Sequence, residues 1–161
     1  MKVIFLDFDG VLNSSIYDRT RDLTKNTSID ETRLPLLKQI IDATNAKIVL
    51  STSWRRHWNQ DNTLCDDVGL WINGLFAKYG LKIYDKTPYL HFGAGRKNEI
   101  LDWLKYSIEP IESYVILDDY TFGWEEISDK LVKTSPCIGR GLEQEHVVKC
   151  IAILNDCWQE K

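Results

Sequence analysis

The chain has 161 residues, of which 43% are hydrophobic and 27% charged, a balance typical of a globular domain with a full core. This composition excludes a disordered chain, and the net charge of −4 excludes a broad basic surface for nucleic acid or an anionic membrane. No apolar run reaches transmembrane length, and the first residues lack the layout of a signal peptide. We therefore expect a single domain over residues 1–161 and no membrane partner.

The four cysteines show neither a CxxC motif nor the spacing typical of zinc sites. We interpret them as free thiols in a reducing compartment, which predicts a cytoplasmic protein. Cys150 and Cys157 are seven residues apart on a predicted helix, so both are expected to face the core. His146, on the same helix, is expected at the surface. The other two cysteines are Cys65 and Cys137.

The first part of the chain alternates apolar runs with polar segments. A buried strand is predicted over residues 2–7, and the polar residues 14–27 are expected to form a loop. An apolar stripe at helical spacing ends near Asn45, and a second buried strand is predicted over 47–52. The candidate N-terminal caps of the helix are a capping box of Ser28 and Glu31, or Asp30.

The rest of the chain repeats this alternation of strands and helices. Helices are predicted at 68–76, from Arg96 onward and over 147–158, strands at 81–84, 114–117 and 131–133, and a loop over 87–95. Strands separated by helices imply βαβ units. The predicted fold class is α/β: a doubly wound, three-layer αβα domain with a mainly parallel, Rossmann-like sheet.

Polar side chains follow three of the predicted strands, where ligands bind in parallel sheets. Asp7 and Asp9 lie at the end of the first strand, and residues 51–53 and 118–119 lie at the ends of two others. Carboxylates at i and i+2 of an extended chain point the same way and repel one another, so a divalent cation between them is expected. Gly10 then allows a sharp turn or close approach to a ligand.

Together these groups supply what phosphoryl transfer needs, which is positioning and charge neutralisation. One carboxylate can attack phosphorus, and a second can donate a proton to the leaving oxygen and then activate water. A hydroxyl can hold a phosphoryl oxygen, a cation can neutralise the phosphate, and an acidic pair can hold Mg²⁺. The candidates are, in that order, Asp7, Asp9, Thr52 or Ser51, Lys97 or Arg96, and Asp118 with Asp119.

The order of these motifs resembles the haloacid dehalogenase (HAD) superfamily of aspartyl-phosphate phosphatases. Residues 7–12 (DFDGVL) match its first motif, and the second, third and fourth resemble residues 48–52 (IVLST), 96–100 (RKNEI) and 115–119 (VILDD). The resemblance implies a HAD fold and a covalent phosphate intermediate on Asp7.

The resemblance also implies a role for each acidic group. Asp7 is the nucleophile and a metal ligand, and Asp9 is the general acid and base, with its backbone carbonyl on Mg²⁺. In the fourth motif, Asp119 ligates the metal directly and Asp118 orients it.

The second and third motifs leave two assignments open. Thr52 is the better-placed hydroxyl of the second motif, with Ser51 as a further substrate contact. Either Arg96 or Lys97 is the phosphate cation, because the register of the third motif is not defined by the sequence.

Within the superfamily, the chain looks closest to the HAD domain of Swiss-Army-knife RNA-repair proteins. The features that carry this resemblance are Ser53-Trp54-Arg55 after the second motif, the short chain, and Gly141-Leu142 before the last helix. Ser53, Arg55 and Gly10 are the further candidate substrate contacts. The alternative for this segment is that Trp54 and Trp58 pack in the core while Arg55 makes a structural ion pair.

The segments between the motifs are too short for a full lid domain, so a capless or minimally capped enzyme is expected. Such an open site can admit a macromolecular end or side chain. We predict a Mg²⁺-dependent phosphomonoesterase acting on a nucleotide or polynucleotide-end phosphate. The alternatives are a protein phosphatase of the same mechanism, for example on phosphotyrosine, and a non-catalytic receiver-like module that binds metal or phosphate.

Overall fold

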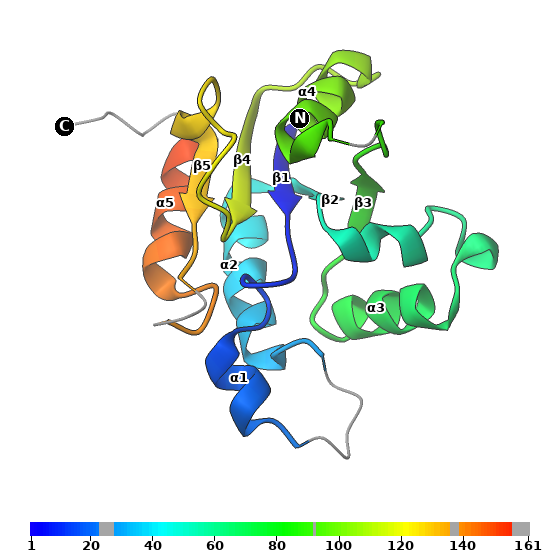
Figure 1. Ribbon diagram of the computed structural model, residues 1–161, viewed down its shortest axis with the longest axis vertical. Coiled ribbons are helices and arrows are strands. Elements are labelled where there is room, and N and C mark those ends of the chain that lie inside the picture. Colours follow the sequence, from blue (N-terminus) through cyan, green and yellow to red (C-terminus); the bar gives the residue numbers. More distant parts are fainter. Residues whose placement is uncertain (23–27, 92, 136–138, 156–161) are drawn as a thin grey trace.

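A five-stranded, all-parallel sheet in the order β3-β2-β1-β4-β5 forms the centre of the molecule (Figure 1). The computed structural model describes residues 1–22, 28–91, 93–135 and 139–155. The predicted α/β fold with a parallel sheet is therefore confirmed. The strands are β1 (Lys2–Leu6), β2 (Lys47–Leu50), β3 (Ile83–Lys86), β4 (Ser113–Asp118) and β5 (Leu131–Lys133).

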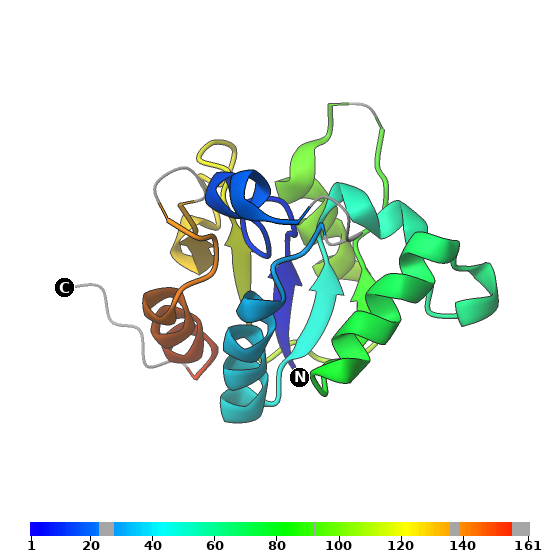
Figure 2. The same cartoon turned by 90° about the horizontal axis from the view of Figure 1, so that it is seen from below.

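Helices cover both faces of the sheet, as a doubly wound fold requires (Figures 1 and 2). Ile4 and Leu6 of β1 belong to the core shared with α2 (Leu34–Thr44), α3 (Asp67–Lys78) and α5 (Gln144–Leu154). Val3 and Phe5 point the other way and pack with residues of α4 (Gly95–Tyr106). This alternation along the central strand places it between two apolar layers.

Local side-chain chemistry explains where the first long helix begins and ends. The Asp30 carboxylate accepts from the backbone N–H of Thr32 and caps the short 3-10 helix η1 (Glu31–Arg33), which leads into α2. Of the two candidate caps, Asp30 is therefore the one the structure uses. Asn45 ends the helix in the left-handed conformation, at φ 56°, where the apolar stripe predicted its end.

Two predicted elements differ from the structure. Residues 15–20, expected to be loop, form α1 (Ser15–Thr20). No residue of this helix is buried, so the sequence has no apolar stripe there from which a helix could be predicted. Ser14 caps it by accepting from the backbone N–H of Tyr17, whereas residues 23–27 lie outside the described residues. The strand predicted at 81–84 is β3, two residues later, because Ile83 is the first residue that pairs with β2.

Ile72 and Phe76 of α3 lie in the core, so this helix is a crossover that covers the sheet. The described residues contain no lid domain, and α1 lies beyond the carboxyl ends of the strands (Figure 1). None of the described helices has the length and apolar character needed to span a bilayer.

Predictions for the last helix and the cysteines have mixed outcomes. Cys150 is buried and free, as expected, and Cys65 is free and half-buried. Cys137 and Cys157 lie outside the described residues. The expectation of a surface position for His146 is wrong, because its side chain is 3% exposed and its ring closes a capping box at the start of α5.

Candidate active site

Asp7, Ser51 and Asp118 form one row across the carboxyl edge of the sheet. Leu6 pairs with Leu50 of β2 and with Leu117 of β4, so the next residues of the three strands are side by side. The backbone ladder continues to this row, because the N–H of Asp7 donates to Leu117 O at 3.0 Å and that of Ser51 to Leu6 O at 2.9 Å. By strand alternation, the row lies on the sheet face covered by α4.

Arg96 reaches this row from the first turn of α4. Its Nη1 contacts the carboxylate of Asp7 and donates to Oδ2 of Asp118 at 2.7 Å. Burial disfavours the charge on the guanidinium, but the two carboxylates outweigh burial and raise the pKa of Arg96. Of the two candidate cations, Arg96 is therefore the one that lies against Asp7.

Lys97 points to a different partner. Its Nζ lies 3.0 Å from Oε2 of Glu126 and 3.8 Å from Oε2 of Glu125, on the connection between β4 and β5. It lines the same pocket as Asp7 and Asp9. Its ammonium therefore links α4 to that connection, and no contact with Asp7 is formed.

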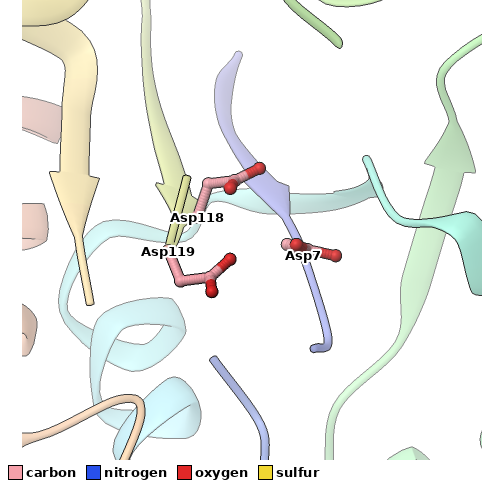
Figure 3. A group of neighbouring side chains, drawn as sticks. All are labelled: Asp7, Asp118 and Asp119. Atoms are coloured by element: carbon pink, nitrogen blue, oxygen red, sulfur yellow. The ribbon is translucent and has the colours of Figure 1, made fainter. Parts of the chain in front are cut away.

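Asp119 completes an acidic group with Asp7 and Asp118 (Figure 3). Each offers a carboxylate oxygen, and these oxygens lie within 4.8 Å of one another. Figure 3 shows Asp118 and Asp119 at the end of β4 with their carboxylates directed toward β1. Because hard oxygen donors at this spacing are the ligands that Mg²⁺ prefers, the group fits this cation.

Burial and neighbouring negative charge disfavour ionisation of two members of the acidic group. Burial raises the pKa of Asp7 to about 6, with a smaller contribution from Asp118 and opposition from Arg96. Burial and the neighbouring Asp118 also raise the pKa of Asp119. Both shifts mean that the ionised carboxylates are disfavoured, and a bound cation would reverse this penalty.

Asp9 is exposed and held from both sides. Its Oδ1 accepts from Asn13 Nδ2 and its Oδ2 from Trp54 Nε1, both at 3.0 Å. Asn13 also accepts from the backbone N–H of Gly10 at 2.8 Å, so it closes the turn that follows Asp9. The sequence analysis gave no role to Asn13, although a polar residue at the end of an apolar run was a usable signal.

The turn after Asp9 depends on two glycines. Gly10 has φ +78°, and a side chain there would collide with the Asp119 carboxylate. Gly141 has φ +81°, and a side chain there would collide with the carbonyl of Val11. The next residue, Leu142, donates its N–H to that same carbonyl at 2.8 Å. The Gly-Leu feature seen in the sequence therefore supports the loop of the first motif.

The two hydroxyl candidates have different surroundings. Ser51 is 1% exposed, and within the described part of the chain its Oγ has no hydrogen-bond partner. Thr52 Oγ1 accepts from the backbone N–H of Trp54 and caps the 3-10 helix η2 (Ser53–His57). Ser51 lies in the row with Asp7, whereas Thr52 does not. Of the two hydroxyls, the structure therefore places Ser51 next to Asp7, whereas the sequence analysis preferred Thr52.

Arg55 forms an ion pair, as the alternative interpretation of this segment predicted. It is 4% exposed, its Nη2 lies 2.7 Å from Glu99 Oε2, and its other nitrogens donate to backbone carbonyls, including those of Thr52 and Thr87. The ring of Tyr89 covers its guanidinium at 3.9 Å. This arrangement is that of a structural ion pair.

Ser53 and Trp54 line a cavity of about 340 Å³ beside the row, together with Arg56 and Trp71. Trp58 is buried and donates to Asn73 Oδ1 at 2.8 Å. The indole of Trp54 therefore bonds to a candidate catalytic residue, Asp9, whereas the indole of Trp58 bonds to Asn73.

The carboxylates of Asp7, Asp9 and Asp119 open into a second cavity of about 660 Å³. Arg96 and Lys97 form one wall of this cavity. The connection between β4 and β5, which the sequence analysis did not single out, also lines this cavity.

Comparison with known proteins adds one match. A family model described as the HAD domain in Swiss Army Knife RNA repair proteins matches residues 3–147. Neither the curated proteins nor the solved structures contain a match.

Proposed function

The chain belongs to the family of HAD domains in Swiss Army Knife RNA repair proteins, and from this premise we propose that it is a Mg²⁺-dependent phosphomonoesterase. The observation that carries the proposal is the row of Asp7, Ser51 and Asp118 with Arg96 bound across it. This arrangement combines a nucleophile, a hydroxyl and a cation at one edge of the sheet.

In the proposed reaction, a carboxylate oxygen of Asp7 attacks phosphorus and the bond from phosphorus to the leaving oxygen breaks. Asp9 donates its proton to that oxygen, which departs as an alcohol. Asp9 then takes a proton from water, and the water oxygen attacks phosphorus and displaces the Asp7 carboxylate. The enzyme is restored, and inorganic phosphate is released.

Neighbouring groups supply the charge balance and orientation for these steps. Arg96 neutralises the nucleophile and the incoming phosphate, and the hydroxyl of Ser51 donates to a phosphoryl oxygen. Asp7, Asp118 and Asp119 would hold Mg²⁺, which supplies further neutralisation of the transferring phosphoryl group. Trp54 and Asn13 position Asp9 through its two carboxylate oxygens.

The proposed substrate is a nucleotide or polynucleotide-end phosphate. The description of the family as part of RNA repair proteins supports this substrate. The absence of a lid among the described residues supports access for a macromolecular end.

The strand order argues against the receiver-like alternative. Receiver domains have the flavodoxin-like order 2-1-3-4-5, whereas this sheet has the order 3-2-1-4-5 of the Rossmann type. In both folds, ligands bind where the strand order reverses. Here the reversal lies between β1 and β4, the two strands that carry the aspartates.

The direct test is hydrolysis of an aryl phosphate by the wild type and by Asp7→Asn, with Mg²⁺ and with a chelator. We expect activity in the wild type with Mg²⁺ only, and a loss of at least about a thousandfold in the variant. Asp129→Asn makes the same change at an exposed position and should leave the rate unchanged. Full activity of Asp7→Asn would refute the nucleophile, and full activity with chelator would refute the metal requirement.

A further inference from the structure

We propose that Tyr120 and Phe122 form a platform on which the nucleobase of the substrate's leaving group stacks. The inference rests on the proposed phosphatase function and concerns the leaving-group side of the same site. Tyr120 follows directly after Asp119 and Phe122 comes two residues later, and both line the 660 Å³ cavity into which Asp7 and Asp9 open.

Both rings are unusually exposed for aromatic side chains. Tyr120 is 62% exposed and Phe122 is 75% exposed. The ring centroids lie 6.4 Å apart and the ring planes are at 84°, so the two rings form a T-shaped pair in which the edge of one contacts the other. This arrangement leaves ring faces uncovered. Exposed aromatic groups at the rim of a cavity are typical of ligand-binding surfaces, and every nucleobase has a face that can stack on them.

The connection that carries the two rings is anchored at several points. The N–H of Tyr120 donates to Asp118 Oδ1 at 2.8 Å, and the buried Trp124 donates from Nε1 to the carbonyl of Tyr120 at 3.2 Å. The ion pair between Lys97 and Glu126 ties the same connection to α4. Because the backbone beneath the rings is held by such contacts, it loses less conformational freedom when a ligand binds to the side chains that it carries.

The size of the cavity and two polar side chains among its lining residues favour a nucleoside over the side chain of phosphotyrosine. About 660 Å³ is in the range of sites for whole organic ligands and exceeds what a phosphoryl group fills. The amide of Asn98 and the hydroxyl of Tyr120 add hydrogen-bonding groups to the same lining. A nucleobase edge carries donors and acceptors that such groups can satisfy, whereas the phenyl ring of phosphotyrosine carries none.

The test compares the wild type with the double variant Tyr120→Leu/Phe122→Leu on adenosine monophosphate and glycerol phosphate, both with Mg²⁺. We expect KM for adenosine monophosphate to rise about tenfold, while kcat/KM for the ringless glycerol phosphate changes by less than about twofold. The matched control, Tyr106→Leu, removes a ring that is equally exposed but lies outside this cavity, and should change neither value. Equal effects on both substrates, or no effect on either, would overturn the platform.

Two further measurements, kinetics with phosphotyrosine and binding of adenosine, distinguish this proposal from its alternatives. A rise in KM for phosphotyrosine without a rise for adenosine monophosphate would overturn the nucleobase in favour of a phenyl ring. Chemical-shift titration with adenosine requires no turnover. Weaker adenosine binding by the double variant, together with a wild type that hydrolyses no ester, would refute the proposed function and support the platform. A wild type that hydrolyses glycerol phosphate but binds adenosine no better than the double variant would refute the platform alone.

Discussion

Single side chains at the candidate site have roles that depend on their exact contacts. Ser51 and Thr52 are adjacent hydroxyl residues, and their chemistry is nearly the same. Only Ser51 continues the row of Asp7 and Asp118, and its buried hydroxyl lacks a partner among the described residues. A buried hydroxyl without a partner is costly, and a ligand that accepts from it would remove this cost.

We therefore expect opposite phenotypes for the two hydroxyl residues. Ser51→Ala should lower kcat/KM for phosphate esters by about tenfold to a hundredfold with little change in melting temperature. Thr52→Ala should cost about 1 kcal/mol of stability through loss of the η2 cap, with a smaller effect on catalysis. Steady-state kinetics and thermal melts of both variants provide the comparison. The reverse pattern would indicate that Thr52, rather than Ser51, donates to the phosphoryl oxygen.

His146 is a second residue whose contacts decide its behaviour. Its Nδ1 accepts from the backbone N–H of Glu143 at 2.9 Å, which requires an unprotonated nitrogen. Burial lowers the pKa of this imidazole, Lys149 acts in the same direction, and Glu145 opposes both. The unfolded chain therefore binds more protons than the folded chain as the pH falls below about 6.5.

The contribution of this residue to the free energy of unfolding should accordingly decrease as the pH falls from 7 to 5. His146→Gln keeps an acceptor for the N–H of Glu143 but cannot titrate, so its stability should fall less over the same range. Urea unfolding at the two pH values measures the difference. Equal slopes for the wild type and His146→Gln would contradict the assignment.

At the scale of elements, Arg55 joins segments that are far apart in the sequence. It lies in η2, pairs with Glu99 of α4 and donates to carbonyls that precede α4, at Thr87 and Pro88. The pair therefore connects the end of β2 to the helix that carries Arg96. Removing one member of a buried pair leaves the other charge without compensation.

Arg55→Met should therefore lower the free energy of unfolding by about 3–5 kcal/mol. Glu99→Gln in the same chain should restore part of that loss, because the unpaired charge is removed. Lys38→Met breaks an exposed pair with Asp42 and should cost less than about 1 kcal/mol. Denaturant unfolding of the four proteins provides the values. Unchanged stability of Arg55→Met with a raised KM would instead make Arg55 a substrate contact.

At the scale of the whole molecule, the topology concentrates acidic groups at one edge of the sheet. β1 lies at the centre of the order β3-β2-β1-β4-β5, so residues near positions 7, 51 and 118 converge although they are distant in sequence. Burial, with a smaller contribution from Asp118, raises the pKa of both Asp7 and Asp119, so the ionised carboxylates are disfavoured at this edge.

The expected consequence is that Mg²⁺ raises the melting temperature of the wild type, because binding to the folded state alone stabilises it by mass action. Asp119→Asn should melt higher than the wild type in chelator, since a disfavoured charge is removed, and should gain less from Mg²⁺. Asp129→Asn should behave as the wild type in both conditions. Thermal melts over a Mg²⁺ titration provide the test, and an equal gain for Asp119→Asn would exclude it as a ligand.

Much of this organisation could be predicted from the sequence, because it depends on local patterns. Apolar runs that alternate with helical stripes implied the parallel αβα fold, and the polar residues after the strands marked the edge where a ligand would bind. The motif at residues 7–12 indicated the HAD family, which the family match over 3–147 confirms. Such features depend on residues close together in the chain, where hydrophobic periodicity and turn chemistry are decisive.

Tertiary structure alone decided between neighbouring residues of similar chemistry. Strand register places Ser51, rather than Thr52, in the row with Asp7, and the first turn of α4 directs Arg96 toward Asp7 and Lys97 toward Glu126. The burial of His146 and the pairing of Arg55 with Glu99 likewise depend on elements far away in the chain. Local sequence does not specify these outcomes, because side-chain direction at a site depends on how distant elements pack.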